Sequence, residues 1–223
     1  MSGDVLTLFD LDHTLVQHDS EQHWVEFLVA ERLLDAGEVM VKSHALTERY
    51  NRGEAGAIEF SEFYLGLMAP HDPTRLEALR DRWIRERVRP CIVPAALRLV
   101  EQHRAAGHRV VVSTAVFRFL AEAEVAEFGI ADLIATEAER IDDRFTGAVA
   151  GVTNSREGKV ERLHAWLADN GERLDRFREV HVYADSMNDV PLLSHATHPV
   201  AVNADPALAA TARHSGWPIL TVA

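Results

Sequence analysis

Two aspartates directly behind a strand-like run near the start of the chain constrain the fold more than any other feature. Residues 5–9 form a short apolar run, and Asp10 and Asp12 follow it two positions apart. Because side chains along a strand alternate between faces, Asp10 and Asp12 are expected to point the same way. Two carboxylates so close repel each other unless a cation lies between them or one is protonated. Open α/β sheets bind ligands at the carboxyl ends of their strands, so the pair predicts a ligand site there, with a solvated Asp-x-Asp turn as the alternative.

Length, charge and cysteine content exclude several classes of protein. The 223 residues are enough for one α/β domain with an insertion. A formal net charge of −12 argues against a partner that is nucleic acid or an anionic membrane. The sequence shows no signal peptide and no apolar run long enough to span a membrane, which predicts a cytoplasmic protein. Cys91 is the only cysteine, and we expect it to be a buried structural thiol in a reducing compartment.

The rest of the chain divides into a helical segment and an alternating segment. Between residues 20 and 88, apolar residues recur at helical spacing and no stretch alternates like a strand. From Pro94 onward, helical stretches separate short apolar, strand-like runs at residues 109–113, 133–135, 180–184, 199–202 and 218–220. Alternating strands and helices predict a parallel sheet covered on both faces. We therefore expect an α/β fold, a doubly wound, Rossmann-like parallel sheet interrupted just after its first strand by an all-helical insertion.

Two further polar positions lie where strands are expected to end. Ser113 and Thr114 follow the valine run directly, and a hydroxyl there suits an anion at the start of the next helix, although a helix cap explains it equally well. Lys159 lies at the start of a predicted helix. A cation is unfavourable at that end of a helix dipole, so Lys159 should have a partner elsewhere, the alternative being an exposed surface lysine.

A third polar group follows the strand at residues 180–184. Asp185, Asn188 and Asp189 lie in a tight turn before the next short helix. Oxygen ligands of this kind suit a hard cation such as Mg²⁺, which binds through one or two carboxylates and keeps several waters. An Asx turn that caps the helix is the alternative.

Taken together, these segments resemble a known family. FDLDHTL, the hydroxyl after VVVS, the lysine in EGKVERL, and YADSMNDVPLL are similar, in this order, to the four motifs of haloacid dehalogenase-like (HAD) phosphatases. The resemblance spans nearly the whole chain and is greatest to the phosphoserine-phosphatase-like branch, subclass IB. It implies a HAD core domain of residues 1–17 and 91–223, and a helical cap domain of the C1 type at residues 18–90.

The resemblance also implies a mechanism of two in-line phosphoryl transfers. Asp10 would attack phosphorus and form an aspartyl-phosphate. Asp12 would protonate the leaving alkoxide and then accept a proton from the attacking water. Thr114 and Lys159 would bind the phosphate oxygens. Thr114 is chosen over Ser113 because it lies seven residues after Gly107 and fifteen before Gly129, as the hydroxyl of the family does.

The cofactor implied by the resemblance is Mg²⁺. The Asp10 side chain, the Asp12 backbone carbonyl and Asp185 would bind it, with Asp189 in support. Two departures from the family pattern follow the last strand: Ala184 stands where a glycine is usual, and Ser186-Met187 stands where a Gly-x pair is usual. The loop that contacts the substrate is therefore expected to differ.

The substrate implied is a small phosphorylated metabolite bearing an amine, such as phosphoserine or histidinol phosphate. In the phosphoserine enzymes an acidic residue just after the first motif and an arginine of the cap grip the amino acid. Asp19 and Arg52 are the corresponding candidates here, with Ser113 and Asn188 as further substrate-binding residues, although Asp19 could simply cap the first helix. A phosphotransferase or mutase, and a non-catalytic phospho-ligand module, are the alternative functions, and the chain is expected to be a monomer or homodimer.

Overall fold

A single parallel sheet organises the protein. The computed structural model describes residues 4–222, apart from the side chain of Asn51. All six strands of the main sheet run parallel, in the order β3-β2-β1-β6-β7-β8. This order reverses between β1 and β6, which places a topological switch point beside β1. The strands are β1 (Val5–Phe9), β2 (Arg109–Phe117), β3 (Asp132–Thr136), β6 (Glu179–Ala184), β7 (His198–Val202) and β8 (Ile219–Leu220).

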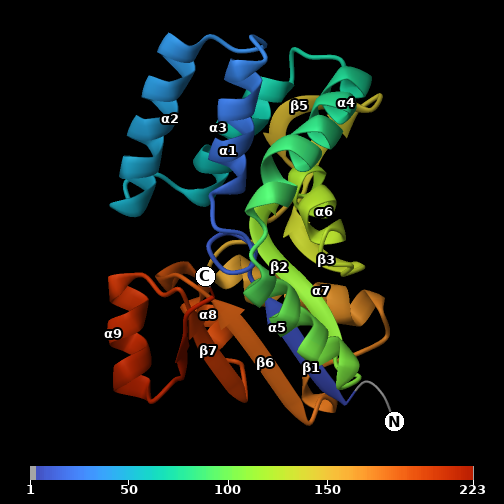
Figure 1. Cartoon of the computed structure of the whole chain (residues 1–223), viewed down its shortest axis with the longest axis vertical. Helices are drawn as coiled ribbons and strands as arrows, with labels where there is room; N and C mark the ends of the chain where they lie inside the picture. The colour runs from blue at the N-terminus through green and yellow to red at the C-terminus, as the bar shows by residue number, and fades with distance from the viewer. Residues whose placement is uncertain (1–3, 223) are drawn as a thin grey trace.

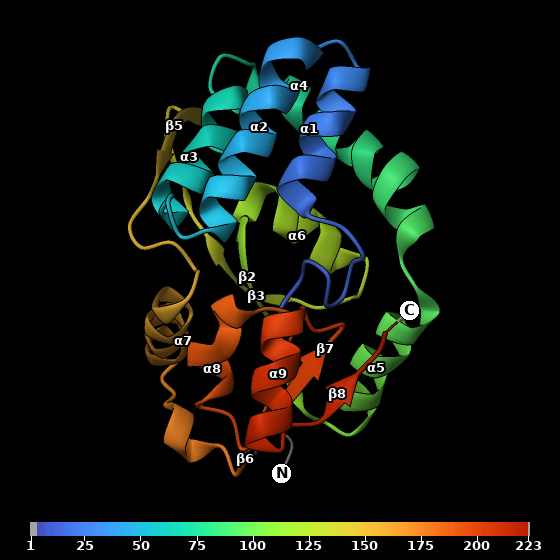
Figure 2. The ribbon, with the colours of Figure 1, turned by 90° about the vertical axis from the view of Figure 1, so that its left-hand side faces the viewer.

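Helices cover both faces of this sheet because its strands are apolar on both sides. Leu6 and Leu8 pack in one buried cluster with Leu163 and Leu208, which come from helices α7 (Glu157–Asp169) and α9 (Pro206–Ser215). Phe9 packs on the other side with residues of α5 (Pro94–Ala105) and α6 (Arg118–Ala126). Figure 2 shows α7, α8 (Val190–Leu193) and α9 away from α5. Short turns of 3₁₀-helix lie at η3 (Leu174–Arg176) and η4 (Met187–Asp189). The predicted doubly wound α/β fold is therefore confirmed.

The insertion after β1 is all-helical, as predicted, and lies beyond the carboxyl ends of the strands (Figures 1 and 2). Its helices are α1 (Ser20–Ala30), α2 (Ala36–Asn51), α3 (Ala57–Met68) and α4 (Pro73–Trp83). Asp19, Asp35 and Asp72 cap α1, α2 and α4 by accepting backbone N–H bonds, which fixes where these helices begin. The chain then returns through a π-helical turn, η1 (Ile84–Val88), and a 3₁₀ turn, η2 (Arg89–Cys91). Within residues 4–222, every helix is too short or too polar to cross a membrane.

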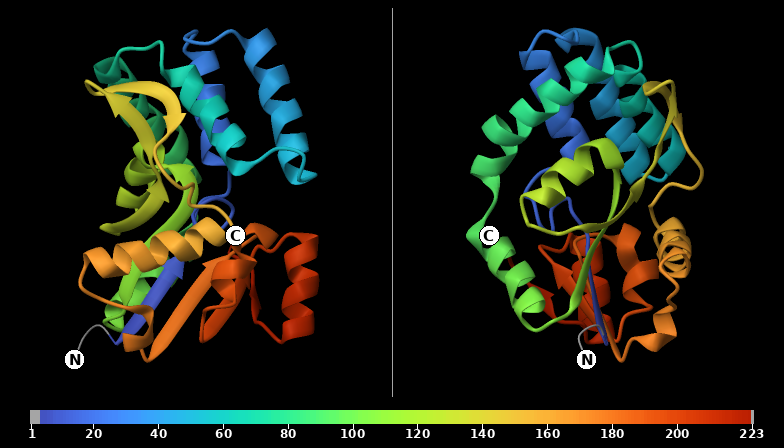
Figure 3. Two further views of the ribbon diagram at one scale, coloured as in Figure 1. Left: turned by 180° about the vertical axis from the view of Figure 1, so that it is seen from behind. Right: turned by 90° about the vertical axis from the view of Figure 1, so that its right-hand side faces the viewer.

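A small hairpin from the core reaches the helical insertion. Strands β4 (Ala138–Ile141) and β5 (Arg144–Val149) are antiparallel, and β5 runs along α3 (Figure 3). Gly147 allows this close approach: its φ is +93°, and a Cβ atom there would lie 3.2 Å from the Cα of Gly66. The insertion is therefore attached to the core by two linkers and by this hairpin.

Two local predictions are corrected by the structure. The strand expected to end at Ser113 continues to Phe117, with a shift in its register against β3 between these two residues, so Ser113 and Thr114 lie within β2. The thiol of Cys91, predicted to be buried, is exposed because η2 lies on the surface of the linker.

Candidate active site

Three carboxylates from distant segments meet at the carboxyl edge of the sheet. β1 and β6 are paired neighbours, so Asp10 and Asp185, which follow them, emerge side by side. Asp189 lies in η4, directly after β6. Asp10, Asp185 and Asp189 each offer an oxygen within 4.8 Å of the others. The three side chains that the sequence assigned to a metal site are therefore brought together. For Asp12 only the backbone carbonyl was expected to bind the metal, and its side chain is held by Ser20 instead.

Lys159, at the start of α7, is paired with two carboxylates, as expected for a cation at that end of a helix. Its Nζ donates to Oδ1 of Asp10 at 2.6 Å and to Oδ1 of Asp189, and the side chain is buried. Burial alone would lower the pKa of Lys159, but Asp10 and Asp189 outweigh this and raise it. Lys159 is therefore charged at neutral pH. A surface lysine is excluded.

The charges of the carboxylate cluster are not balanced by Lys159 alone. Burial, with the charge of Asp189, raises the pKa of Asp10 to about 6, although Lys159 opposes the rise. Burial and the neighbouring Asp10 and Asp189 raise the pKa of Asp185 to about 8. Carboxylates that resist ionisation in this way favour an added cation. A set of donors made only of oxygen fits a hard divalent ion such as Mg²⁺.

Asp12 occupies a separate environment. Its Oδ2 accepts the backbone N–H of Ser20 at 3.1 Å and its Oδ1 accepts the Ser20 hydroxyl. Burial, reinforced by the charges of Asp19 and Glu124, raises the pKa of Asp12 well above its usual value. Asp12 therefore holds a proton more readily than an ordinary aspartate, as a proton donor must.

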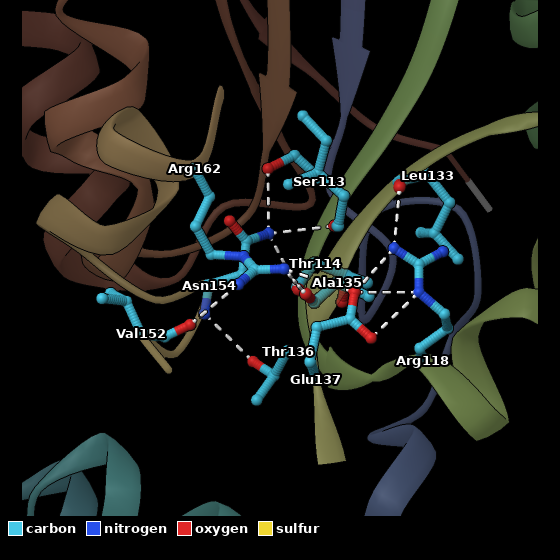
Figure 4. Close-up of polar contacts among 11 residues, drawn as sticks. Ser113, Thr114, Arg118, Leu133, Ala135, Thr136, Glu137, Val152, Asn154 and Arg162 are labelled. Atoms are coloured by element: carbon cyan, nitrogen blue, oxygen red, sulfur yellow. Dashed lines mark hydrogen bonds and ion pairs between the residues drawn. The ribbon is translucent and has the colours of Figure 1, made fainter. Parts of the chain in front are cut away.

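The two hydroxyl candidates on β2 lie in different surroundings. Thr114 lines the cavity that holds the carboxylate cluster, and its Oγ1 accepts the N–H of Val116 at 3.2 Å. Ser113 is not among the cavity residues, and its Oγ accepts from Nδ2 of Asn154 at 3.1 Å (Figure 4). Side chains of neighbouring residues along a strand point to opposite faces, which explains why Thr114 faces the cavity and Ser113 does not.

Asn154 is a residue that sequence reasoning missed. It is fully buried, and its Nδ2 lies 2.9 Å from the carbonyl of Thr114 and 3.0 Å from that of Ile134. Its backbone N–H donates to Thr136 (Figure 4). Asn154 therefore joins β2 and β3 to the loop that leads to Lys159. Its sequence context, Thr-Asn-Ser, is typical of any loop and carries no signal of this role.

Two further features hold the same loop in place. Glu137 pairs with Arg118 of α6 at 2.8 Å and with Arg162 of α7 at 3.3 Å (Figure 4). Gly158, the second residue of α7, lies so close to the preceding loop that a Cβ atom would clash with the carbonyl oxygen of Thr153. Only glycine fits immediately before Lys159.

The cavity has a volume of about 880 Å³, and its cap wall is acidic. Asp19, Glu21 and Glu26 line it from the insertion. Glu21 is only 5% exposed, its Oε1 has no hydrogen-bond partner, and burial raises its pKa well above the usual value. Among the described residues that line the cavity, the only lysine and arginine are Lys159 and Arg156.

Arg156 was also missed by the sequence reasoning. Its Nε donates to Oδ1 of Asn188 at 3.1 Å, and its guanidinium lies 5.6 Å from the centre of the Tyr50 ring. Its φ of +52° is unusual for a residue other than glycine, so the loop holds it in a strained conformation. Because Arg156 belongs to the core, the arginine found among the described residues of the cavity is not supplied by the cap.

The remaining predicted substrate residues divide into two groups. Asp19 caps α1 by accepting the N–H of Gln22 at 2.8 Å and also lines the cavity, so both of its interpretations are compatible with its position. Asn188 lines the cavity as well. Arg52 is exposed, pairs with Glu54 at 2.9 Å and is not a cavity residue. The structure does not bring Arg52 or Ser113 to the site.

Fold and site together define an α/β enzyme with a carboxylate centre beneath a helical cap. The haloacid dehalogenase-like hydrolase family matches residues 7–194. A histidinol-phosphatase of Neisseria meningitidis serogroup C (strain 8013) is 35% identical over 96% of this chain and 97% of its own. Phosphoserine phosphatase SerB1 of Mycobacterium tuberculosis is 29% identical over 95% of this chain and 68% of its own. The chain belongs to the haloacid dehalogenase-like hydrolase family, and within it is a phosphoric monoester hydrolase.

Solved structures agree on the fold. A protein of unknown function from Bordetella pertussis Tohama I is 41% identical, with a TM-score of 0.94 over 98% of this chain and 99% of that one. A phosphoserine phosphatase solved as a phospho-aspartyl intermediate analogue has a TM-score of 0.68 over 98% of this chain and 93% of that one. At 18% identity, this second likeness concerns the fold alone.

Proposed function

We propose that the protein is a Mg²⁺-dependent phosphatase that hydrolyses a small, amine-bearing phosphomonoester through an aspartyl-phosphate, with histidinol phosphate as the leading candidate. The observation that carries the proposal is the pairing of the Asp10, Asp185 and Asp189 cluster with an acidic cap wall across one cavity. The cluster suits phosphoryl transfer, and the cap wall suits a cationic leaving group. The similarity to a histidinol-phosphatase over nearly the whole chain supports the same substrate.

Asp10 is the proposed nucleophile. Lys159 donates to its Oδ1, which orients the carboxylate and favours its ionised form against burial. Attack by Asp10 forms an oxygen–phosphorus bond while the bond from phosphorus to the ester oxygen breaks, which splits one difficult displacement into two. Water then hydrolyses the aspartyl-phosphate and restores Asp10. The Thr114 hydroxyl and the Lys159 ammonium, which both line the cavity, would bind the phosphate oxygens.

Asp12 is the proposed general acid and base. Its raised pKa supplies the proton that the leaving alkoxide needs, and the carboxylate left behind accepts a proton from water in the second step. Ser20, which holds Asp12, is the first residue of α1. The orientation of the acid therefore depends on the position of the cap.

Asp10, Asp185 and Asp189, with the backbone carbonyl of Asp12, would hold Mg²⁺. When bound, the ion supplies positive charge that offsets the repulsion between the Asp10 carboxylate and an anionic phosphate.

The cap wall favours a substrate without a carboxylate. Phosphoserine carries both an ammonium and a carboxylate, whereas histidinol phosphate carries an ammonium and an imidazole. A carboxylate beside the acidic residues Asp19 and Glu21 would be disfavoured. Its expected partner Arg52 pairs with Glu54 outside the cavity, and Arg156, the arginine that lines the cavity, already donates to Asn188 of the core. Like charges brought together at an interface cost several kcal/mol. A phosphorylated amino alcohol therefore fits better than a phosphorylated amino acid.

Phosphate release from the two substrates tests this proposal. With Mg²⁺ present, we expect kcat/KM for histidinol phosphate to exceed that for phosphoserine by about 10²-fold, the equivalent of about 3 kcal/mol of transition-state discrimination. Glu21→Gln should narrow the ratio mainly through KM, because it removes a carboxylate whose ionised form a bound ammonium group would stabilise. Glu38→Gln, on an exposed turn of α2, is the matched control and should leave the ratio unchanged. Equal kcat/KM values for the two substrates would contradict the proposal.

The cluster also predicts how stability depends on pH and Mg²⁺. The pKa of Asp185 is raised to about 8, so between about pH 6.5 and pH 8 the folded metal-free protein retains a proton that the unfolded chain has lost. Its melting temperature should therefore fall as pH rises through this window. Since Mg²⁺ binds the deprotonated carboxylates, the rise in melting temperature that it causes should be larger at the higher pH. Thermal unfolding with Mg²⁺ or EDTA measures both effects.

Asp185→Asn is the variant that tests the cause, because it should remove most of this pH dependence. A melting temperature of the metal-free protein that rises across this pH window would contradict the assignment of the effect to Asp185.

The proposed enzyme has two domains. We assign residues 1–17 and 91–223 to the core domain and residues 18–90 to the cap domain, with the β4–β5 hairpin of the core as an added contact to α3. The enzyme would act in the cytoplasm as a monomer or homodimer.

A further inference from the structure

A second group of metal-ligating side chains lies at the opposite edge of the sheet from the phosphate cavity. Glu179 and His181 are two residues apart on β6, so their side chains share one face. His198 begins β7 and is the register partner of His181. The three residues lie at the amino ends of these strands, whereas Asp185 follows the carboxyl end of β6. Figure 1 shows this edge at the far end of the molecule from the cap.

The ligand atoms of these residues converge. One atom from each of Glu179, His181 and His198 lies within 4.8 Å of the other two. The imidazole rings of His181 and His198 stack at 4.4 Å with only 12° between their planes. Ligands of a tetrahedral zinc ion are about 3.3 Å apart, since each Zn–N bond is about 2.0 Å long, so modest side-chain rotations complete the site.

Neighbouring groups orient His198 and Glu179 from outside the cluster, and Glu179 in turn contacts His181. The Nδ1 atom of His198 is 2.9 Å from the hydroxyl of Thr197, which directs its Nε2 atom away from that partner. Oε1 of Glu179 pairs with Arg178 at 3.1 Å, and its Oε2 lies 3.4 Å from Nε2 of His181. Such outer contacts are typical of metal sites, where they fix the tautomer and direction of each ligand.

The surroundings also favour neutral imidazoles, the form that binds metals. The ring of His108 stacks on that of His181, with 5.6 Å between their centres, and the ring of His103 lies 5.2 Å from that of His181, edge-on. Two stacked, protonated rings would repel each other, whereas a divalent ion between neutral rings would be attracted to Glu179.

We propose that Glu179, His181 and His198 form a second cation site, which binds zinc or a similar nitrogen-preferring divalent metal and links β6 to β7. Two imidazoles and one carboxylate are a common zinc ligand set that leaves a fourth position for water. Mg²⁺ prefers oxygen ligands, so the two ends of the sheet would select different ions. This site does not depend on the proposed phosphatase function, because no residue of the cavity takes part.

Metal titration of the full chain tests the proposal. The metal-free protein is first saturated with Mg²⁺, then titrated with Zn²⁺ by calorimetry and with Co²⁺ by visible absorption, where tetrahedral Co²⁺ absorbs strongly. We expect the wild type and Asp185→Asn each to bind one Zn²⁺ with similar affinity. The affinity of His198→Ala and of His181→Gln for Zn²⁺ should be lower by at least about 10-fold. His195→Ala is the control, because His195 is exposed and lies outside the cluster.

Thermal unfolding supplies a second readout. Zn²⁺ should raise the melting temperature of the wild type and of His195→Ala but not that of His198→Ala, whose exposed side chain can be removed without disturbing the core. If His198→Ala and His181→Gln bind Zn²⁺ as tightly as the wild type, or if only Asp185→Asn loses binding, the second site does not exist.

Discussion

Asp10→Asn is expected to lower kcat for phosphate release by at least about 10⁴-fold, because the amide cannot act as the nucleophile that splits the reaction into two steps. The fold should survive, since Lys159 keeps its contact with Asp189 and the new side chain has nearly the same shape. Single-turnover phosphate release with Mg²⁺, beside circular dichroism and thermal unfolding, measures the effect.

Asp12→Asn provides the comparison for this variant. It retains the nucleophile but removes the acid and base, so a loss of about 10²–10⁴-fold is expected. Asp12→Asn should still bind a phosphate mimic with Mg²⁺, because its side chain lies outside the carboxylate cluster. Wild-type turnover by Asp10→Asn would exclude Asp10 as the nucleophile, whatever the behaviour of Asp12→Asn.

Lys159→Met is expected to lower the free energy of unfolding of the metal-free protein by about 3–5 kcal/mol, the range seen when one partner of a buried ion pair is removed. Methionine fills a similar volume but leaves Asp10 and Asp189 buried without a cation. Added Mg²⁺ should restore part of the loss, because it brings positive charge to the same carboxylates. Urea unfolding with and without Mg²⁺ measures both quantities.

Lys42→Met is the matched control. Lys42 also pairs with a carboxylate, Glu38, but both side chains are more than half exposed. Solvent screening makes such a pair worth at most about 0.5 kcal/mol. If Lys159→Met costs no more than Lys42→Met, the buried cluster does not depend on Lys159 and its proposed role in holding Asp10 is wrong.

The sequence by itself was sufficient for the fold class and for the order of the chemical groups along the chain. The apolar run before Asp10 and the strand before Asp185 are local signals, because strand ends in a parallel sheet are marked by a change from apolar to polar residues. The valine run before Thr114 located β2 in the same way, although not its end. The all-helical insertion was equally visible, since helical spacing and capping aspartates repeat through it. These features depend on neighbours in sequence, so sequence reasoning reaches them.

Only the tertiary structure decided which side chains face one another. Ser113 and Thr114 are adjacent in sequence, yet one turns to Asn154 and the other to the cavity. Arg52 satisfies its charge with Glu54 rather than in the site. The meeting of His181 with His198 likewise depends on the register of β6 against β7. The physical reason is common to all three: hydrogen bonds and charges are satisfied by partners that are close in space, and local sequence does not specify which distant segment provides them.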